Sequence, residues 1–182
     1  MTQEDLNKIV KEHRNWIHGE GGSRAVLRDA VLRDADLRGA DLRDAALRGA
    51  DLRGAVLCGA DLCGAVLCGA VLCDAALCDA TVPKVEKLHS KIAEAIERGG
   101  KLEMGAWHSC ETTHCRGGWA VVLAGENGRA LENAVGIGTA AALIYATAYP
   151  DQRVPDFYTD NETAMEDIKR CAAEEMAVNG SP

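Results

Sequence analysis

Residues 50–80 read ADLRGAVLCGADLCGAVLCGAVLCDAALCDA, and the pattern in them repeats every five residues. The same pattern begins upstream at Ala25, from which alanine recurs at every fifth position. Leucine recurs at the same interval from Leu27 to Leu77, which gives eleven units of the form A-x-L-x-G/D without an insertion. We call residues 24–80 the repeat region.

Neither an α-helix nor a flat strand accommodates this period. Five residues of helix turn the chain by about 500°, so successive leucines would lie about 140° apart and share no face. In a strand, alanine and leucine share a face, but the next alanine comes three residues later and falls on the opposite one. The chain must therefore turn where Gly or Asp stands in each unit, and corners of one hand make a coil whose layers stack.

The eleven units are similar to those of the pentapeptide-repeat family, whose motif is A-[D/N]-L-x-x, and the match covers residues 25–80. The resemblance implies a β-solenoid, namely a right-handed quadrilateral β-helix with four units, or about 20 residues, per coil. Eleven units would make just under three coils, with leucine and the first-position alanine pointing inward. The inward leucines would be Leu27, Leu32, Leu37, Leu42, Leu47, Leu52, Leu57, Leu62, Leu67, Leu72 and Leu77.

An interior of leucine and alanine leaves no room for a ligand, so any function of the repeat region would lie on its outer faces or its ends. The sequence departs from the family motif at the second position of five units. Valine replaces Asp or Asn there, at Val26, Val31, Val56, Val66 and Val71. These valines make the outer surface more apolar and favour a packed contact.

The residue after each leucine is arginine in six units and cysteine in the next five. The cysteines are Cys58, Cys63, Cys68, Cys73 and Cys78. With four units per coil, four successive cysteines would point from four sides and could not converge on one metal, whose thiolates lie about 2.3 Å from the ion. Only Cys58 and Cys78 would stack, one layer apart. We therefore expect surface thiols, with a Cys58–Cys78 or an intermolecular disulfide as the alternative.

Composition divides the chain into three regions: residues 1–23, a capping helix and linker; residues 24–80, the repeat region; and residues 81–182, a mainly α-helical C-terminal domain. The first region is predicted to be a helix, because Thr2 and Asp5 form a near capping box and the apolar residues that follow them lie on one face. Both ends of a stacked coil need covers. The resemblance implies that this helix covers the first coil.

After Ala80 the composition changes, and Pro83 marks the start of an amphipathic helix over 83–98. This helix is the candidate cover for the last coil. Further helices are predicted at 113–124, 128–135, 139–148 and 160–177, the last with a capping box from Thr159 to Glu162.

The candidate chemistry lies in GAWHSCETTHCRGGWAVVLAG, residues 105–125. It contains four zinc-type ligands: His108, Cys110, His114 and Cys115. The spacing is not that of a common zinc knuckle, and adjacent residues on a helix diverge by about 100°, so three ligands fit one ion better than four. Three other readings are open. Cys115 is a helix-start nucleophile with a histidine base, it pairs with Cys110, or it packs in the core while Thr112 or Thr113 caps the helix.

The net charge of −8 opposes non-specific binding to nucleic acid, which requires Lys and Arg to displace counterions. The polar N-terminus does not resemble a signal peptide, and no apolar run approaches the ~18 residues of a membrane span. We therefore expect a cytoplasmic protein with reduced cysteines, no cofactor, no membrane contact and no direct contact with nucleic acid.

The function expected from these features is that of a non-enzymatic scaffold for protein–protein interaction, a monomer or weak homodimer with a protein partner that the sequence does not identify. The family resemblance implies an alternative, which is binding to DNA gyrase by mimicry of DNA. Such mimicry needs a long acidic rod, whereas the repeat region carries 9 acidic and 7 basic residues. A further alternative is metal binding or thiol-dependent activity at residues 108–115.

Overall fold

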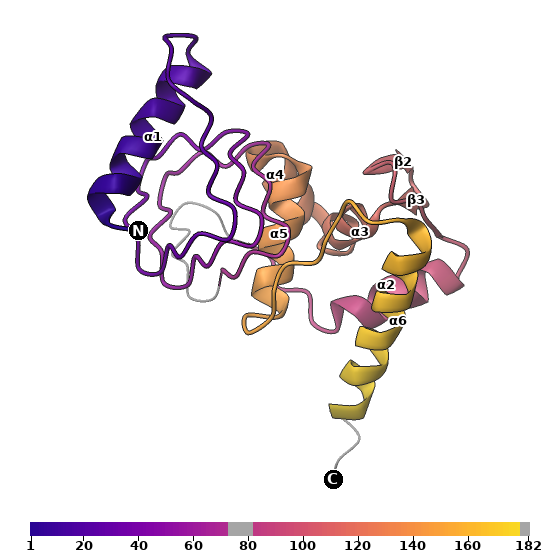
Figure 1. Cartoon of the computed structure of the whole chain (residues 1–182). Helices are drawn as coiled ribbons and strands as arrows, with labels where there is room; N and C mark the ends of the chain where they lie inside the picture. The colour runs from indigo at the N-terminus through magenta and orange to yellow at the C-terminus, as the bar shows by residue number, and fades with distance from the viewer. Residues whose placement is uncertain (73–81, 179–182) are drawn as a thin grey trace.

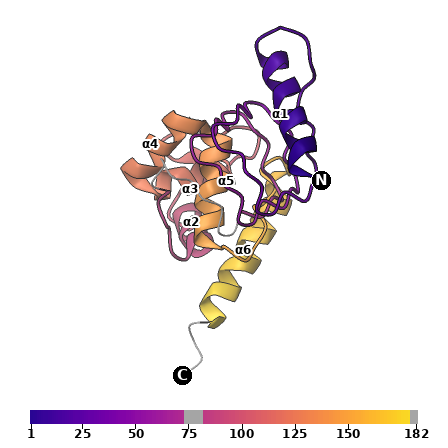
Figure 2. The same cartoon turned by 90° about the vertical axis from the view of Figure 1, so that its left-hand side faces the viewer.

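The computed structural model describes residues 1–72 and 82–178. Helix α1 (Gln3–Ile17) lies at one end, and the loops of the repeat region follow it (Figure 1). Helices α2 (Leu88–Glu97), α3 (Arg116–Leu123), α4 (Gly125–Val135), α5 (Ile137–Ala148) and α6 (Asn161–Val178) form the other end. The view turned by 90° again places α1 and α2–α5 on opposite sides of these loops (Figure 2).

The repeat region pairs with itself at a separation of 20 residues. Six isolated parallel bridges join second-position residues, from Val26 with Ala46 to Asp51 with Val71. The Leu27 N–H donates to the Ala46 carbonyl (2.8 Å), and the Ala46 N–H donates to the Ala25 carbonyl (3.0 Å). Each turn of the coil therefore takes four units, with single-residue bridges in place of strands.

The interior of this coil holds the leucines and most of the first-position alanines. Every leucine from Leu27 to Leu72 is at most 6% exposed, and Leu77 lies outside the described residues. Among the alanines of the described repeats, only Ala30 and Ala60 are half-buried rather than buried. The predicted inward positions up to Leu72 are thus confirmed.

Each described corner turns through the left-handed region of the backbone. Asp29 has φ 54° and Gly49, one coil later, has φ 72°. The Asp29 carboxylate lies over Gly49, so that a Cβ on Gly49 would fall 2.1 Å from its Oδ1 atom. Glycine in the second coil therefore makes room for aspartate in the first.

Helix α1 covers the first coil, as predicted, and begins with the Thr2–Asp5 capping box. The Gln3 side chain pairs with the Asp36 peptide: its Nε2 donates to the carbonyl (2.9 Å), and its Oε1 accepts from the N–H (3.0 Å). Buried His13 accepts from the Ala25 N–H at Nδ1 (3.1 Å) and donates from Nε2 to the Arg43 carbonyl (2.9 Å). Side chains of α1 thus replace some of the contacts of a missing coil, which keeps the edge peptides hydrogen-bonded.

The other end of the described coil is covered by α5 and the segment 149–160. Val154 exchanges backbone hydrogen bonds with Gly69 (2.7 Å) and Ala70 (3.0 Å). The Thr139 hydroxyl donates to the Leu62 carbonyl (2.6 Å). Among the described residues, these polar contacts come from α5 and its following segment and not from the helix predicted at 83–98.

That helix also begins later than predicted, at Leu88 instead of Pro83. Lys87 precedes it with a left-handed backbone (φ 53°). The N–H groups of His89 and Ser90 donate to the Glu175 carboxylate at 3.1 and 2.9 Å. The cap is supplied by a residue 85 positions away, so the local pattern could not locate the helix start.

The C-terminal region is mainly helical, with one small sheet that the sequence did not predict. The strands are β1 (Lys101–Leu102), β2 (His108–Cys110) and β3 (Thr113–His114), in the order β1-β3-β2. β1 is parallel and β2 antiparallel to β3. Residues 113–115, predicted as the first turn of a helix, therefore precede α3. Asp160, rather than Thr159, caps α6 by accepting from the Thr163 N–H (2.8 Å).

Within the described residues, no helix combines the length and apolar character that a membrane span requires.

Candidate functional site

The outer surface of the first coil carries ordered ion pairs and exposed valines. Asp36 accepts two hydrogen bonds from the Arg38 guanidinium (2.9 and 2.5 Å), which lowers the pKa of Asp36 to about 2. Arg43 holds Asp41 in the same way and lowers its pKa. Val26 and Val31 are 66% and 61% exposed. The other outward valines up to Val71 are half-buried.

The cysteines of the repeat region do not form a uniform set of surface thiols. Cys63 is exposed and free, as expected, but Cys68 is only 3% exposed. The segment 149–160 covers it, and the Phe157 N–H donates to its sulfur (3.5 Å). Cys58 is disulfide-bonded rather than free. Cys73 and Cys78 lie outside the described residues, and so does the predicted stacking of Cys58 on Cys78.

Two of the four predicted metal ligands come together in the small sheet. His108 and His114 face each other across the antiparallel β2–β3 pair, with 2.7 Å between their Nδ1 atoms. The Glu111 carbonyl can only accept, so the His114 Nε2 donates to it (3.0 Å). Burial lowers the pKa of His114, so its neutral ring accepts at Nδ1 from His108. The His108 Nε2 atom lies 3.4 Å from the Glu132 carboxylate of α4.

The two cysteines of this block lie in different environments. Cys115 is buried and caps α3, because its sulfur accepts from the Gly118 N–H (3.2 Å), the role predicted for Thr112 or Thr113. Burial raises the pKa of its thiol, contrary to the activated Cys115 considered from the sequence. Cys110 is exposed, and hydrogen bonds from the Thr113 side chain and the Thr112 N–H lower the pKa of its thiol to about 7. Both thiols are free, so they do not form the redox pair.

A metal centre does not result from this arrangement. The described residues contain no group of three or more His, Cys, Asp or Glu side chains placed to hold an ion. His108, Cys110 and His114 instead line a cavity of about 340 Å³ together with Glu132 and Arg129 of α4. The chemistry available there is that of an exposed thiol beside two histidines.

A buried polar cluster, which the sequence reasoning missed, joins four helices of the C-terminal region. Arg116 of α3 is only 2% exposed. Its guanidinium donates to the Tyr145 hydroxyl of α5 (3.1 Å), to the Asp167 carboxylate of α6 (2.5 Å) and to the Nδ1 of His89 on α2 (3.1 Å). Every arm of the guanidinium thus has a partner on a different helix, as a buried charge requires.

Burial shifts the pKa values of this cluster. Burial, and then the nearby Arg116 charge, lowers the pKa of His89 to about 4, so the ring is neutral at pH 7. Burial raises the pKa of Tyr145 to about 12, and burial with the neighbouring Glu175 raises that of Tyr149. His89 stacks on Tyr149 with 4.6 Å between ring centroids, and both line a cavity of about 320 Å³.

One signal in the sequence could have located this cluster. His89 falls on the apolar stripe of its helix, between Val85 and Ile92, where a polar side chain must find a buried partner. Arg116 precedes two glycines whose missing side chains admit Trp107: a Cβ on Gly117 would lie 2.7 Å from its ring. Asp167, the partner of Arg116, gave no such signal.

The repeats match a known family. The family model described as pentapeptide repeats, eight copies, matches residues 23–57 and 50–81. Residues 23–81 are pentapeptide repeats. The match agrees with the 20-residue pairing of the coil over the same residues. Comparison with curated proteins and with solved structures found no match.

Proposed function

We propose that this pentapeptide-repeat protein is a non-enzymatic scaffold that mediates protein–protein interaction. The observation that carries the proposal is the contrast between the two sides of the coil wall. Leu47 and Leu52 are fully buried, whereas Val26 is 66% exposed. The interior is filled by side chains, so the repeat region offers partners its outer faces and its ends.

The proposed architecture is a right-handed quadrilateral β-helix of just under three coils, supported by the family match and by the 20-residue pairing. In it, Val26 and Val31 occupy the second positions of consecutive units and lie on adjacent faces. Arg28 and Arg33 follow them, and both are exposed. An apolar contact rimmed by cations is a composition typical of protein interfaces.

A photo-crosslinking residue at Val26 or Val31, introduced in the native host, tests the proposal. We expect both positions to capture the same protein, while Lys169, exposed on α6, captures none. With that partner purified, Val26→Asp and Val31→Asp should each weaken binding about tenfold or more, and Lys169→Asp should change it less than about twofold. Capture that is equal at all three positions would contradict a specific outer face.

The ion pairs weigh against DNA mimicry. Asp36, Asp41 and Asp51 each accept from the arginine two residues later, so these carboxylates do not form the unpaired acidic rows of a DNA-like surface. A supercoiling assay provides the check. We expect no inhibition of gyrase at a large molar excess of the protein.

Cys110 supports a second candidate function, which is thiol-dependent activity. Its thiol is exposed, its pKa is lowered to about 7, and it lines the same cavity as two histidines. The rate of alkylation by iodoacetamide, followed by peptide mapping between about pH 5 and 10, tests this role. Cys110 should react half-maximally near pH 7, whereas a half-maximal rate reached only near the pKa of about 8.5 of an ordinary cysteine thiol would remove the basis for this candidate.

A further inference from the structure

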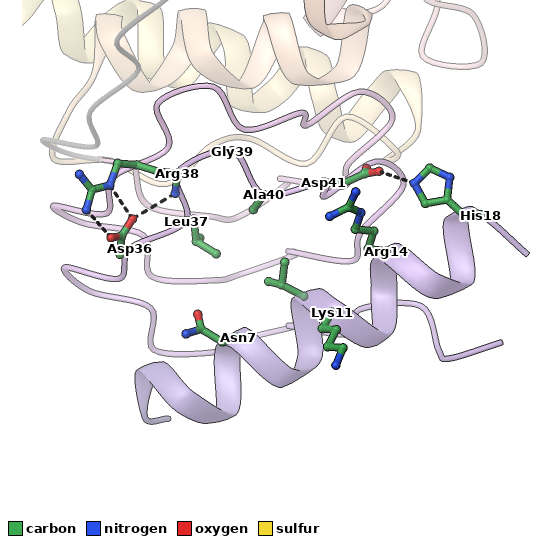
Figure 3. A pocket seen from close by; sticks show the side chains of 11 residues that line it. Asn7, Lys11, Arg14, His18, Asp36, Leu37, Arg38, Gly39, Ala40 and Asp41 are labelled. Atoms are coloured by element: carbon green, nitrogen blue, oxygen red, sulfur yellow. Dashed lines mark hydrogen bonds and ion pairs between the residues drawn. The ribbon is translucent and has the colours of Figure 1, made fainter. Parts of the chain in front are cut away.

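A groove lies between α1 and the first coil (Figure 3). Its volume of about 520 Å³ is within the range of ligand pockets. Asn7, Lys11 and Arg14 of α1 line it together with His18, the C-cap of that helix, and residues 36–41 line it from the coil. We call this feature the α1 groove.

The groove exists because no earlier coil lies beneath this side of the first one. A Cβ on Gly39 would meet no atom within 4 Å, whereas one on Gly49 in the second coil would strike the Asp29 carboxylate. Helix α1 takes the place of the missing coil at Asp36, but it stands away from the corner that follows. The space at Gly39 is therefore open to another molecule.

The charge of the α1 groove is positive, although the chain as a whole carries −8. Its two carboxylates, Asp36 and Asp41, are already held by Arg38 and Arg43. Lys11 and Arg14 lie one helical turn apart on α1 and form no ion pair within the described residues. The groove thus presents two cations without a fixed counterion.

The wall of the groove also presents peptide groups. In the second coil the Asp61 N–H donates to the Ala40 carbonyl (2.9 Å), and the Asp61 carbonyl accepts from the Leu42 N–H (2.8 Å). Both groups of Asp61 therefore face the first coil. By the same repeat geometry both peptide groups of Asp41 face away from the second coil, and neither has a hydrogen-bond partner among the described residues.

The Gln3 carboxamide shows what fits such a position. At Asp36, the equivalent residue one unit earlier, it accepts from the N–H and donates to the carbonyl. A carboxamide has the same donor and acceptor as a peptide unit. The edge of the first coil is thus built to pair with an amide, and at Asp41 the amide must come from outside the described chain.

We propose that the α1 groove binds an extended acidic segment of a partner protein. One peptide unit of the segment pairs with Asp41, as the Gln3 carboxamide pairs with Asp36, and a neighbouring glutamate or aspartate reaches Lys11 and Arg14. Main-chain hydrogen bonds supply affinity and the charge supplies specificity, as in other cases of strand addition. The inference rests on the proposed scaffold function and adds to it a second surface, with the chemistry of the partner segment that this surface binds.

Fluorescence anisotropy with the full-length protein tests the inference. The probe is a labelled, terminally blocked TVEVT peptide, compared with TVQVT and with TVEVT methylated on its backbone nitrogens. We expect TVEVT to bind at least about tenfold more tightly than either comparison peptide. Lys11→Glu and Arg14→Glu should each weaken TVEVT binding about tenfold, and Lys8→Glu less than about threefold. Lys8 is the matched control, since it is exposed on the same helix but does not line the groove.

Three outcomes would overturn the inference. TVQVT binding as tightly as TVEVT would remove the role of charge, and the methylated peptide binding equally well would remove the pairing with Asp41. No binding of TVEVT at about 5 mM would remove the site itself. None of these outcomes touches the proposed scaffold function, whose own test is capture of a partner at Val26 and Val31.

Discussion

The repeat region and the helical C-terminal region bury their cores by opposite means. In the repeat region each unit contributes one leucine and one alanine, and its backbone pairs with the unit that lies 20 residues later. In the C-terminal region the single guanidinium of Arg116 donates hydrogen bonds to side chains of three other helices. Stability in the repeats is therefore shared among equivalent positions, as in other repeat proteins, and among the helices it is concentrated at a single charged group.

The largest expected effect comes from removing that group. Arg116→Ala leaves Asp167 half-buried and without one of its two cations, and removes the donor to the His89 ring and to the Tyr145 hydroxyl. We expect a loss of about 3–5 kcal/mol in the free energy of unfolding, measured by urea denaturation with tryptophan fluorescence and circular dichroism. Arg170→Ala, which removes an exposed partner of the same Asp167, should cost less than about 1 kcal/mol. Equal losses would show that the cluster is not the centre of this core.

The repeat region should show uniform losses instead. Leu47→Ala removes a fully buried side chain and should cost about 2–5 kcal/mol in the same assay. Leu42→Ala, Leu52→Ala and Leu57→Ala should give values within about 1 kcal/mol of it, since the four leucines occupy equivalent, fully packed layers. Val31→Ala on the outer surface serves as the control and should cost less than about 0.5 kcal/mol. A loss at one leucine that is much larger than at the others would contradict the equivalence of the layers.

Acid should weaken the C-terminal region through His89. Its pKa is about 4 in the folded protein, against about 6.5 in an unfolded chain. Above about pH 6.5 the ring is neutral in both states, and its contribution is fully present. As the pH falls from about 6.5 to 4, His89 is protonated in the unfolded chain but stays neutral in the folded protein. The free energy of unfolding therefore falls by up to about 3 kcal/mol.

The measurement for His89 is urea denaturation at several pH values, compared with His89→Gln, whose side-chain oxygen can still accept from Arg116. The pKa values of Asp167 and Glu175 are also lowered in the folded protein, so both proteins lose stability in acid. Only the wild type should show the additional loss between about pH 6.5 and 4. Parallel curves would assign all of the loss to the carboxylates.

Substitutions at two corner glycines measure how much the contact between stacked coils adds to stability. Gly39→Ala and Gly49→Ala both place a Cβ at positive φ (63° and 72°), which costs about 1–2 kcal/mol. Gly49→Ala also forces the Asp29 carboxylate to move, whereas Gly39 faces open space. We expect Gly49→Ala to be the more destabilising, and Asp29→Ala to remove most of that difference in the double variant. Equal losses in the free energy of unfolding for the two substitutions would mean that the stacking of corners does not affect stability.

These two regions also differ in how far the sequence predicts them. In the repeat region the role of each residue is set within its own unit, so the period alone located the inward leucines and the corners. The limit appears where another segment of the chain intervenes. Cys68 has the same place in its unit as Cys63, yet it is buried, because Phe157 covers it from 89 positions away.

In the C-terminal region such long-range contacts decide most of the detail. The start of α2 depends on Glu175, and the environment of Cys115 depends on the small sheet that displaces the first turn predicted for its helix. Helix positions followed from apolar periodicity, but the partners of Arg116 did not, since they lie on three helices. The sequence thus located the candidate residues 108–115 but not the geometry that distinguishes Cys110 from Cys115.

Because the coil pairs at a separation of 20 residues, the number of repeat units sets both the distance and the angle between the two ends of the coil. Each added unit would turn α1 by about a quarter revolution relative to α5, and four added units would restore its direction while separating the ends by about 4.8 Å. Two added units would instead point the α1 groove to the opposite side. Relatives that differ by whole coils would therefore present two partners in the same relative orientation at graded distances, and relatives that differ by single units would rotate one partner about the other.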